Sequence, residues 1–197
     1  METVSTIEYY NKNAEKYSDS TLNADVSGLY DHFIPKIQKT ASILDLGCGS
    51  GRDSKYFLDA GYHVTAVDGS GELCRLASEL IHQPVRMLLF KDLDYHEEFD
   101  AVWACASLLR VPKTEIHDIM LKVSESIKPD GILYMSVKHG NSERTDGERS
   151  FSDYSEADIP LLLNGTGLEL VEHWISQDVR QGRNTEKWLN LIAHKQI

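Results

Sequence analysis

The chain reads Ile43-Leu44-Asp45-Leu46-Gly47-Cys48-Gly49-Ser50-Gly51 where an apolar run passes into a glycine-rich turn. Glycine lets the backbone turn tightly and approach a ligand with no side chain in the way. A second apolar run, Tyr62–Val67, ends at Asp68, about 20 residues after the turn, where a carboxylate can accept hydrogen bonds from both hydroxyls of a ribose. Together the two runs predict a nucleoside-binding α/β fold.

The spacing of the glycines distinguishes between two ligands. A dinucleotide site needs G-x-G-x-x-G/A, in which the third small residue packs helix against strand. Counted from Gly47, that third position is Arg52, and the spacing is G-x-G-x-G preceded by Asp45. An acid and exposed carbonyls beside the loop suit the ammonium-bearing tail of S-adenosylmethionine (SAM). A purely structural turn and a nicotinamide or nucleotide-sugar oxidoreductase remain the alternatives.

Alternating strands and helices follow a helical first part of the chain. Pro35 is expected to kink or restart the second of two N-terminal helices. Residues 138–150 are polar and are expected to form a long exposed loop. Strands are expected at Ser42–Leu46, Tyr62–Val67, Val85–Phe90, Phe99–Cys105, Ile132–Val137, about 168–178 and about 186–194, the last two joined by Arg180-Gln181-Gly182-Arg183.

This alternation predicts a Rossmann-like, doubly wound, mostly parallel seven-stranded sheet with an antiparallel C-terminal hairpin strand. We expect one domain over residues 1–197, with 1–40 as a helical cap and 41–197 as the catalytic α/β core. In such sheets the ligand lies at the carboxyl ends of the strands, where the strand order reverses.

The composition argues against several classes of partner. The net charge of −11 disfavours nucleic acid and anionic membrane surfaces, which need Lys and Arg. Cys48, Cys74 and Cys105 lack zinc-ligand spacing, and no metal site is expected. The first residues, Met1–Ser5, show no signal peptide, and no apolar run approaches the ~20 residues of a membrane span. A cytoplasmic protein, monomer or homodimer, that acts on a small molecule is the resulting expectation.

Residues of about 42–137 resemble the core of class I SAM-dependent methyltransferases. Ile43–Gly51 resembles the first motif of that family and Asp68 its second-strand acid. The loop Cys105–Pro112 and the tail Trp188-Leu189-Asn190 resemble a tellurite-resistance-like subgroup, whose members commonly carry His where this chain has Arg110. The resemblance implies SAM as cofactor and the following cofactor-binding residues: Tyr17, Asp45, Gly47, Cys48, Gly49, Arg52, Asp68, Gly69, Asp92, Leu93 and Ala104.

The acceptor is expected to be small and possibly anionic: a metalloid oxyanion, a thiol or a carboxylate metabolite. DNA methyltransferases of this class carry a Pro-Pro-aromatic or Pro-Cys motif after the fourth strand, which Ala104–Ser107 lacks. A protein acceptor, and a SAM-binding regulatory or accessory protein without turnover, remain alternatives. Tyr17, His139 and Arg110 are the candidate catalytic residues. The candidate pocket-lining residues are Tyr9, Tyr10, Tyr17, Arg110, Lys138, His139, Arg149, Arg180 and Arg183.

Overall fold

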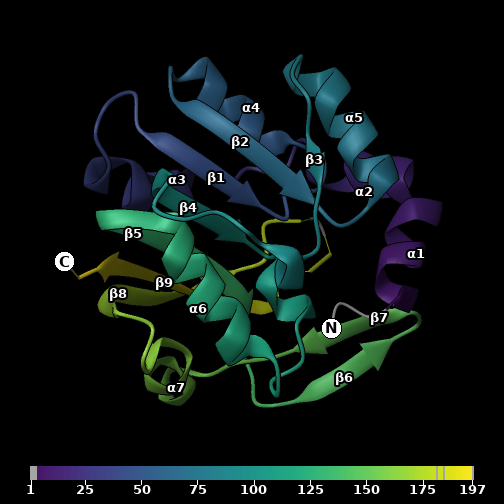
Figure 1. Ribbon diagram of the computed structural model, residues 1–197. Coiled ribbons are helices and arrows are strands. Elements are labelled where there is room, and N and C mark those ends of the chain that lie inside the picture. Colours follow the sequence, from purple (N-terminus) through teal and green to yellow (C-terminus); the bar gives the residue numbers. More distant parts are fainter. Residues whose placement is uncertain (1–3, 181, 184, 197) are drawn as a thin grey trace.

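The computed structural model describes residues 4–180, 182–183 and 185–196, in which seven strands form one sheet (Figure 1). The strand order is β3-β2-β1-β4-β5-β9-β8, and β6 and β7 form a separate hairpin. All neighbours from β3 to β5 are parallel, while β9 runs antiparallel to both β5 and β8. The expected mostly parallel sheet with one antiparallel C-terminal strand is therefore confirmed. The strands are β1 Ser42–Leu46, β2 His63–Asp68, β3 Arg86–Met87, β4 Phe99–Cys105, β5 Ile127–Lys138, β6 Glu143–Asp146, β7 Arg149–Ser152, β8 Leu168–Gln177 and β9 Lys187–Lys195.

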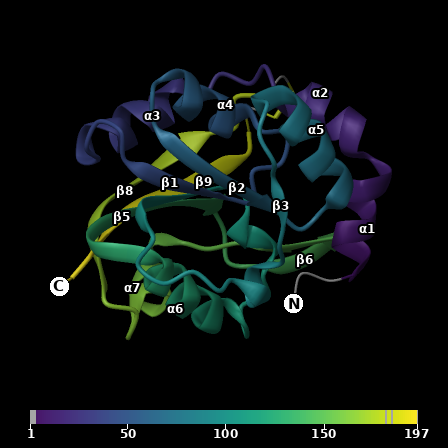
Figure 2. The same cartoon turned by 45° about the horizontal axis from the view of Figure 1, so that its top comes forward.

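Helices cover both faces of the sheet. Figure 2 shows α3, α4 and α5 on one face and α6 and α7 on the other. No helix within the described residues is long and apolar enough to cross a membrane. The α-helices are α1 Val4–Lys12, α2 Ala14–Thr21, α3 Ser27–Phe33, α4 Arg52–Asp59, α5 Gly71–Ile81, α6 Ile116–Ser126 and α7 Ile159–Leu163, and the 3-10 turns are η1 Ile34–Lys36, η2 Phe90–Asp92, η3 Leu108–Arg110 and η4 Glu156–Asp158.

The central strand β4 contributes side chains to two separate hydrophobic cores, because successive side chains of a strand point to opposite faces of the sheet. Val102 and Ala104 join the core under α6, whereas Ala101 and Trp103 join the core under α3 and α4. Trp103 is fully buried and stacks on Tyr134 of β5 with ring centroids 3.9 Å apart. Burial on both faces explains why this strand reads as a continuous apolar run.

Local signals fix several helix ends. Ser70 caps α5, because its hydroxyl accepts the backbone N–H of Leu73 at 3.2 Å. Pro160 interrupts the sequence pattern but lies in the first turn of α7, where a missing N–H costs little. Pro35 likewise ends α3 by turning it into η1.

The N-terminal part departs from the two helices expected. It forms three, because Asn13 separates α1 from α2 and its amide donates to the carbonyl of Tyr9 at 2.8 Å. The expected strand Val85–Phe90 is also shorter, and only Arg86–Met87 pair with β2.

Residues 138–150 are mostly exposed, as expected, but the expectation that they form a long loop is wrong. Glu143–Asp146 and Arg149–Ser152 pair as an antiparallel hairpin. Its support comes from a distant element, since Thr6 of α1 donates to the carbonyl of Glu148 at 3.2 Å and accepts the N–H of Ser150. In Figure 1 the hairpin lies beside α1. The strand expected at Ile132 begins at Ile127, and Gln181 of the expected connection lies outside the described residues.

Candidate active site

The glycine loop joins β1 to α4 at the point where the strand order reverses. Gly47 and Gly49 have φ values of +78° and +55°, and the N–H of Gly47 donates to the carbonyl of Val67 at 2.9 Å. A Cβ on Gly47 would lie 2.5 Å from the Cβ of Ser107, and one on Gly49 would lie 3.2 Å from the Tyr17 ring. Both positions need glycine because the loop after β4 and helix α2 already fill the space beside them.

Asp68 ends β2, and its carboxylate ties two turns together. One oxygen accepts the N–H of Gly49 at 2.9 Å, and the other accepts the N–H of Ser70 at 2.8 Å. Burial raises the pKa of Asp68, and these hydrogen bonds from Ser70 and Gly49 offset part of that rise. The structure thus brings the glycine loop and the second-strand acid into contact.

Asp45 points into the protein instead. It is 2% exposed and accepts the hydroxyl of Ser54 at 2.5 Å. Burial, together with repulsion from Asp53, raises the pKa of Asp45 to about 8. The carboxyl is therefore largely protonated at neutral pH, and it lies outside the pocket wall described below.

Ser107 carries a buried hydroxyl with no hydrogen-bond partner among the described residues. It faces Gly47, and the Phe90 ring lies 3.3 Å from where a Cβ of that glycine would be. Of the two expected cofactor-binding residues that follow β3, Leu93 is buried in the core and Asp92 is exposed. An orphaned buried hydroxyl beside a loop that tolerates no side chain fits a ligand with polar edges, such as the nucleoside of SAM.

Arg52 begins α4 and forms a two-pronged ion pair with its neighbour Asp53, with N–O distances of 2.7 and 2.9 Å. Asp53 also accepts the Tyr30 hydroxyl at 2.6 Å and the Trp103 indole N–H at 2.9 Å. Burial opposes the charge of Asp53, but Arg52 and these hydrogen bonds hold its pKa below the usual range. Arg52 and Asp53 line the pocket, so α4 presents it with a neutralised pair.

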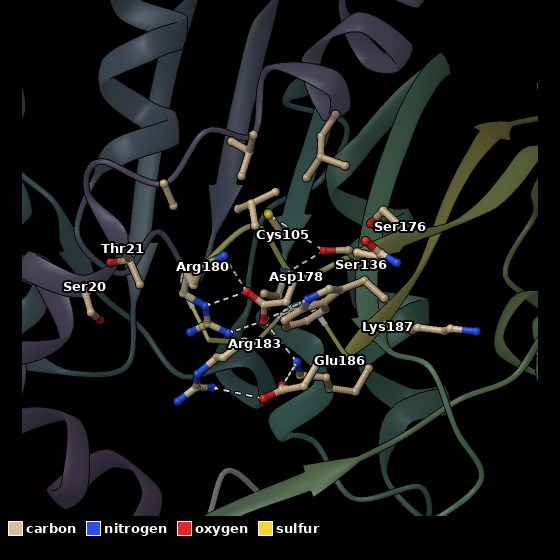
Figure 3. A pocket seen from close by; sticks show the side chains of 18 of the residues that line it. Ser20, Thr21, Cys105, Ser136, Ser176, Asp178, Arg180, Arg183, Glu186 and Lys187 are labelled. Carbon is tan, nitrogen blue, oxygen red and sulfur yellow. Dashed lines mark hydrogen bonds and ion pairs between the residues drawn. The ribbon is translucent and has the colours of Figure 1, made fainter.

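Most of the candidate residues line one pocket. The cavity has a volume of about 1050 Å³ and is bounded by α1 and α2, the ends of β4 and β5, the β6–β7 hairpin and the β8–β9 connection (Figure 3). Small-molecule sites have this size. Candidates that line it are Tyr9, Tyr17, Gly47, Cys48, Arg52, Arg110, Lys138, His139, Arg149, Arg180 and Arg183. Candidates outside the described lining are Tyr10, Asp45, Gly49, Asp68, Gly69, Asp92, Leu93 and Ala104.

The candidate bases differ in what they can do. Burial, followed by the neighbouring Tyr10, raises the pKa of Tyr17, so its phenol stays protonated. His139 directs Nε2 at the Glu156 carboxylate, 2.9 Å away. Cys105 also lines the pocket, but burial raises the pKa of its thiol to about 12. The thiol is therefore neutral at physiological pH, which argues against a nucleophilic role.

Sequence reasoning missed several residues of this region. Ser107 and Ser136 were not singled out, nor was Phe151, although the last two line the pocket. Ser107 lies two residues after the end of β4, and Ser136 lies opposite Cys105 on β5. The sequence signal that could have found the two serines is their position near the carboxyl end of a predicted strand.

Known proteins resemble this chain in both sequence and fold. Residues 43–131 match the family described as "Methyltransferase domain". YqeM of Bacillus subtilis (strain 168), named as a methyltransferase, is 34% identical over 105 residues, which cover 48% of this chain and 41% of that protein. The match therefore spans less than half the length of that relative.

Two crystal structures show the same fold. One is the 1,6-didemethyltoxoflavin-N1-methyltransferase of Burkholderia thailandensis with bound 1,6-didemethyltoxoflavin and S-adenosylhomocysteine. It superposes with a TM-score of 0.75 at 22% identity, covering 97% of this chain and 85% of that one. The other is a TehB-like SAM-dependent methyltransferase from Corynebacterium glutamicum, with a TM-score of 0.70 at 19% identity, covering 96% and 98%.

The sequence match supports a methyltransferase domain at residues 43–131, and the solved structures show that the fold is Rossmann-like. The tellurite-resistance-like subgroup is not confirmed, because the TehB-like structure shares the fold alone at its low identity.

Proposed function

We propose, from a methyltransferase domain at residues 43–131, that this chain transfers the methyl group of SAM to a small anionic acceptor. The observation that carries the proposal is the cavity of about 1050 Å³, which adjoins the glycine loop and is lined by Arg110 and Arg149. A cationic cleft draws anions even into a protein of net charge −11, since a local cluster of charges focuses the field.

The chain's own residues would bind and orient the cofactor. When bound, SAM supplies a sulfonium methyl group, a strong electrophile for in-line displacement. Asp68 would accept hydrogen bonds from the ribose hydroxyls, and the glycine loop would let the cofactor approach the backbone. The hydroxyl of Ser107, which has no partner among the described residues, would hydrogen-bond a polar edge of the cofactor. Holding two reactants in contact supplies about 7–11 kcal/mol of the barrier in favourable cases.

The state of the pocket's own groups favours an acceptor that is already ionised. A general base is required only where the acceptor carries a proton at neutral pH. Tyr17 is held protonated and Cys105 is held as a neutral thiol. A carboxylate or a metalloid oxyanion needs no base, so we favour these two acceptor classes over a thiol. Tellurite is one metalloid oxyanion to test as an acceptor.

The test has a binding step and a turnover step. Calorimetry should give micromolar affinity for SAM and S-adenosylhomocysteine and far weaker binding of NAD and NADP. Labelled SAM is then incubated with the protein and a panel of carboxylates, tellurite, thiols and a metabolite extract. NAD binding as tight as SAM binding would overturn the proposal. SAM binding without label transfer to any of these acceptors would favour a regulatory SAM-binding protein.

A further inference from the structure

Five of the cations that line the pocket fall into two groups. In the first group, Lys138 contacts both Asp178 and Glu186. Arg180 contacts Asp178 at 2.5 Å, as the dashed lines of Figure 3 show. Burial opposes the charge of Asp178, but Arg180 and Lys138 hold its pKa well below the usual range. Arg183 reaches Glu186 at 3.7 Å. These cations are compensated, and they hold the β8–β9 connection against β5.

The second group, Arg110 and Arg149, lies across the pocket where η3 meets β7. Arg110 donates to the Ser150 carbonyl at 3.0 Å and to the Tyr10 hydroxyl at 2.5 Å, and it lies 3.9 Å over the Phe151 ring. Within the described residues every one of these partners is neutral, and none is a carboxylate. A half-buried guanidinium thus keeps its full charge beside the pocket.

Arg149 reinforces that charge. Its side chain is 18% exposed, its Nε is buried with no partner among the described residues, and it lies over the Tyr9 ring at 4.8 Å. Its ion-pair partner, Asp146, is 65% exposed and therefore well screened by water. Burial lowers the pKa of Arg110, Tyr10 and Tyr17 raise it in part, and the positive charge of Arg149 lowers it further.

We infer that Arg110 and Arg149 bind the anionic group of the methyl acceptor, an oxyanion such as a carboxylate or a phosphate. The inference rests on the proposed function for the identity of the ligand as an acceptor. Two guanidinium groups offer forked donors that match the paired oxygens of such groups, and an anion would balance the charge of Arg110, which no carboxylate among the described residues contacts. Tyr9 and Phe151 add apolar surface for the carbon skeleton beside the anionic group.

The anion site can be tested on the full chain without knowing the acceptor. The probes are inorganic phosphate and benzoate, titrated at constant ionic strength against chloride. The variants are Arg110→Gln and Arg149→Gln, with Arg183→Gln as the matched control from the compensated group. We expect phosphate or benzoate to bind the natural protein, binding to weaken at least about tenfold in the first two variants, and binding to stay within about twofold in the control.

The same proteins are titrated with S-adenosylhomocysteine, whose affinity should stay within about twofold throughout. If the natural protein binds S-adenosylhomocysteine but neither probe, or if the Arg183→Gln variant loses the probes as strongly as the other two, the inference fails while the proposed function stands. If S-adenosylhomocysteine does not bind, the proposed function fails, and the probes still decide the arginine pair. Should Arg110→Gln fail to fold, Arg149→Gln decides the test, because its ion-pair partner is an exposed carboxylate.

Discussion

Replacing Gly47 with alanine tests whether the glycine loop is closed to side chains. An added Cβ would lie 2.5 Å from the Cβ of Ser107 in a backbone with φ of +78°. Two costs therefore add. An L-residue in the left-handed region costs about 1–2 kcal/mol. Forcing a methyl group into filled space costs about 1–3 kcal/mol more. The free energy of unfolding should fall by about 2–5 kcal/mol.

Substitutions at two other glycines separate the cost of the left-handed backbone from the cost of the steric overlap. Gly61 has φ of +91° and open space around its Cβ position, so Gly61→Ala should show the backbone cost alone. Gly28 lies in α3 with neither constraint, so alanine there should leave stability unchanged or raise it by up to about 1 kcal/mol. The double variant Gly47→Ala/Ser107→Gly removes the overlap between the added Cβ and the Ser107 side chain. Its loss of unfolding free energy should therefore shrink to about that of Gly61→Ala.

The assay is urea unfolding followed by circular dichroism, with S-adenosylhomocysteine binding measured on each folded variant. The reasoning is refuted if Gly47→Ala costs no more than Gly61→Ala. It is equally refuted if removing the Ser107 side chain restores no stability, because the close approach to the Ser107 Cβ would then not be the source of the cost.

Three further outcomes are expected. Asp68→Ala should weaken SAM binding in calorimetry by about 1.5–3 kcal/mol, and unchanged affinity would remove this carboxylate from the site. Because Asp45 has a pKa raised from 3.8 to about 8, the folded protein holds a proton that the unfolded chain has lost between these values, so stability falls as pH rises through this window. Urea unfolding at pH 5 and pH 8 should show a smaller loss of stability between the two pH values in Asp45→Asn than in the natural protein. An equal loss in both proteins would contradict the prediction. Arg52→Gln should cost about 3–5 kcal/mol in unfolding free energy by leaving Asp53 buried without its cation, and a loss below about 1 kcal/mol would show the pair to be solvated.

The parts of the fold that could be predicted are those with local signals. Ser42–Leu46 and Phe99–Cys105 are apolar runs long enough for a strand, and Ser70 caps the helix that follows β2. The β6–β7 hairpin could not be predicted, since Glu143–Asp146 are all exposed and show no alternation. Its pairing depends on contacts with Thr6, more than 130 residues earlier in the chain, which no local pattern contains.

For the candidate site, too, the sequence predicts what is local, and it does not predict contacts between distant residues. Arg110, Lys138 and Arg180 could be placed near the pocket because they follow predicted strands. Which of them keeps its charge could not be predicted, because that depends on partners brought together by folding. Lys138 meets Asp178 from 40 residues away, whereas the partners of Arg110 are a carbonyl and a phenol.

The protonation state of Tyr10 decides whether Arg110 is available to a ligand. Tyr10 accepts a hydrogen bond from Arg110 and would neutralise it if the phenol ionised. Arg110 and Arg149 both favour that ionisation, yet burial outweighs them and raises the pKa of Tyr10. The phenol therefore orients the guanidinium without cancelling its charge. Tyr10 also packs edge-on against Tyr17, 5.1 Å away, and Tyr17 lies over Gly49. The same two tyrosines of α1 and α2 thus cover the glycine loop and hold the uncompensated arginine, so the N-terminal helices contribute to both halves of the site.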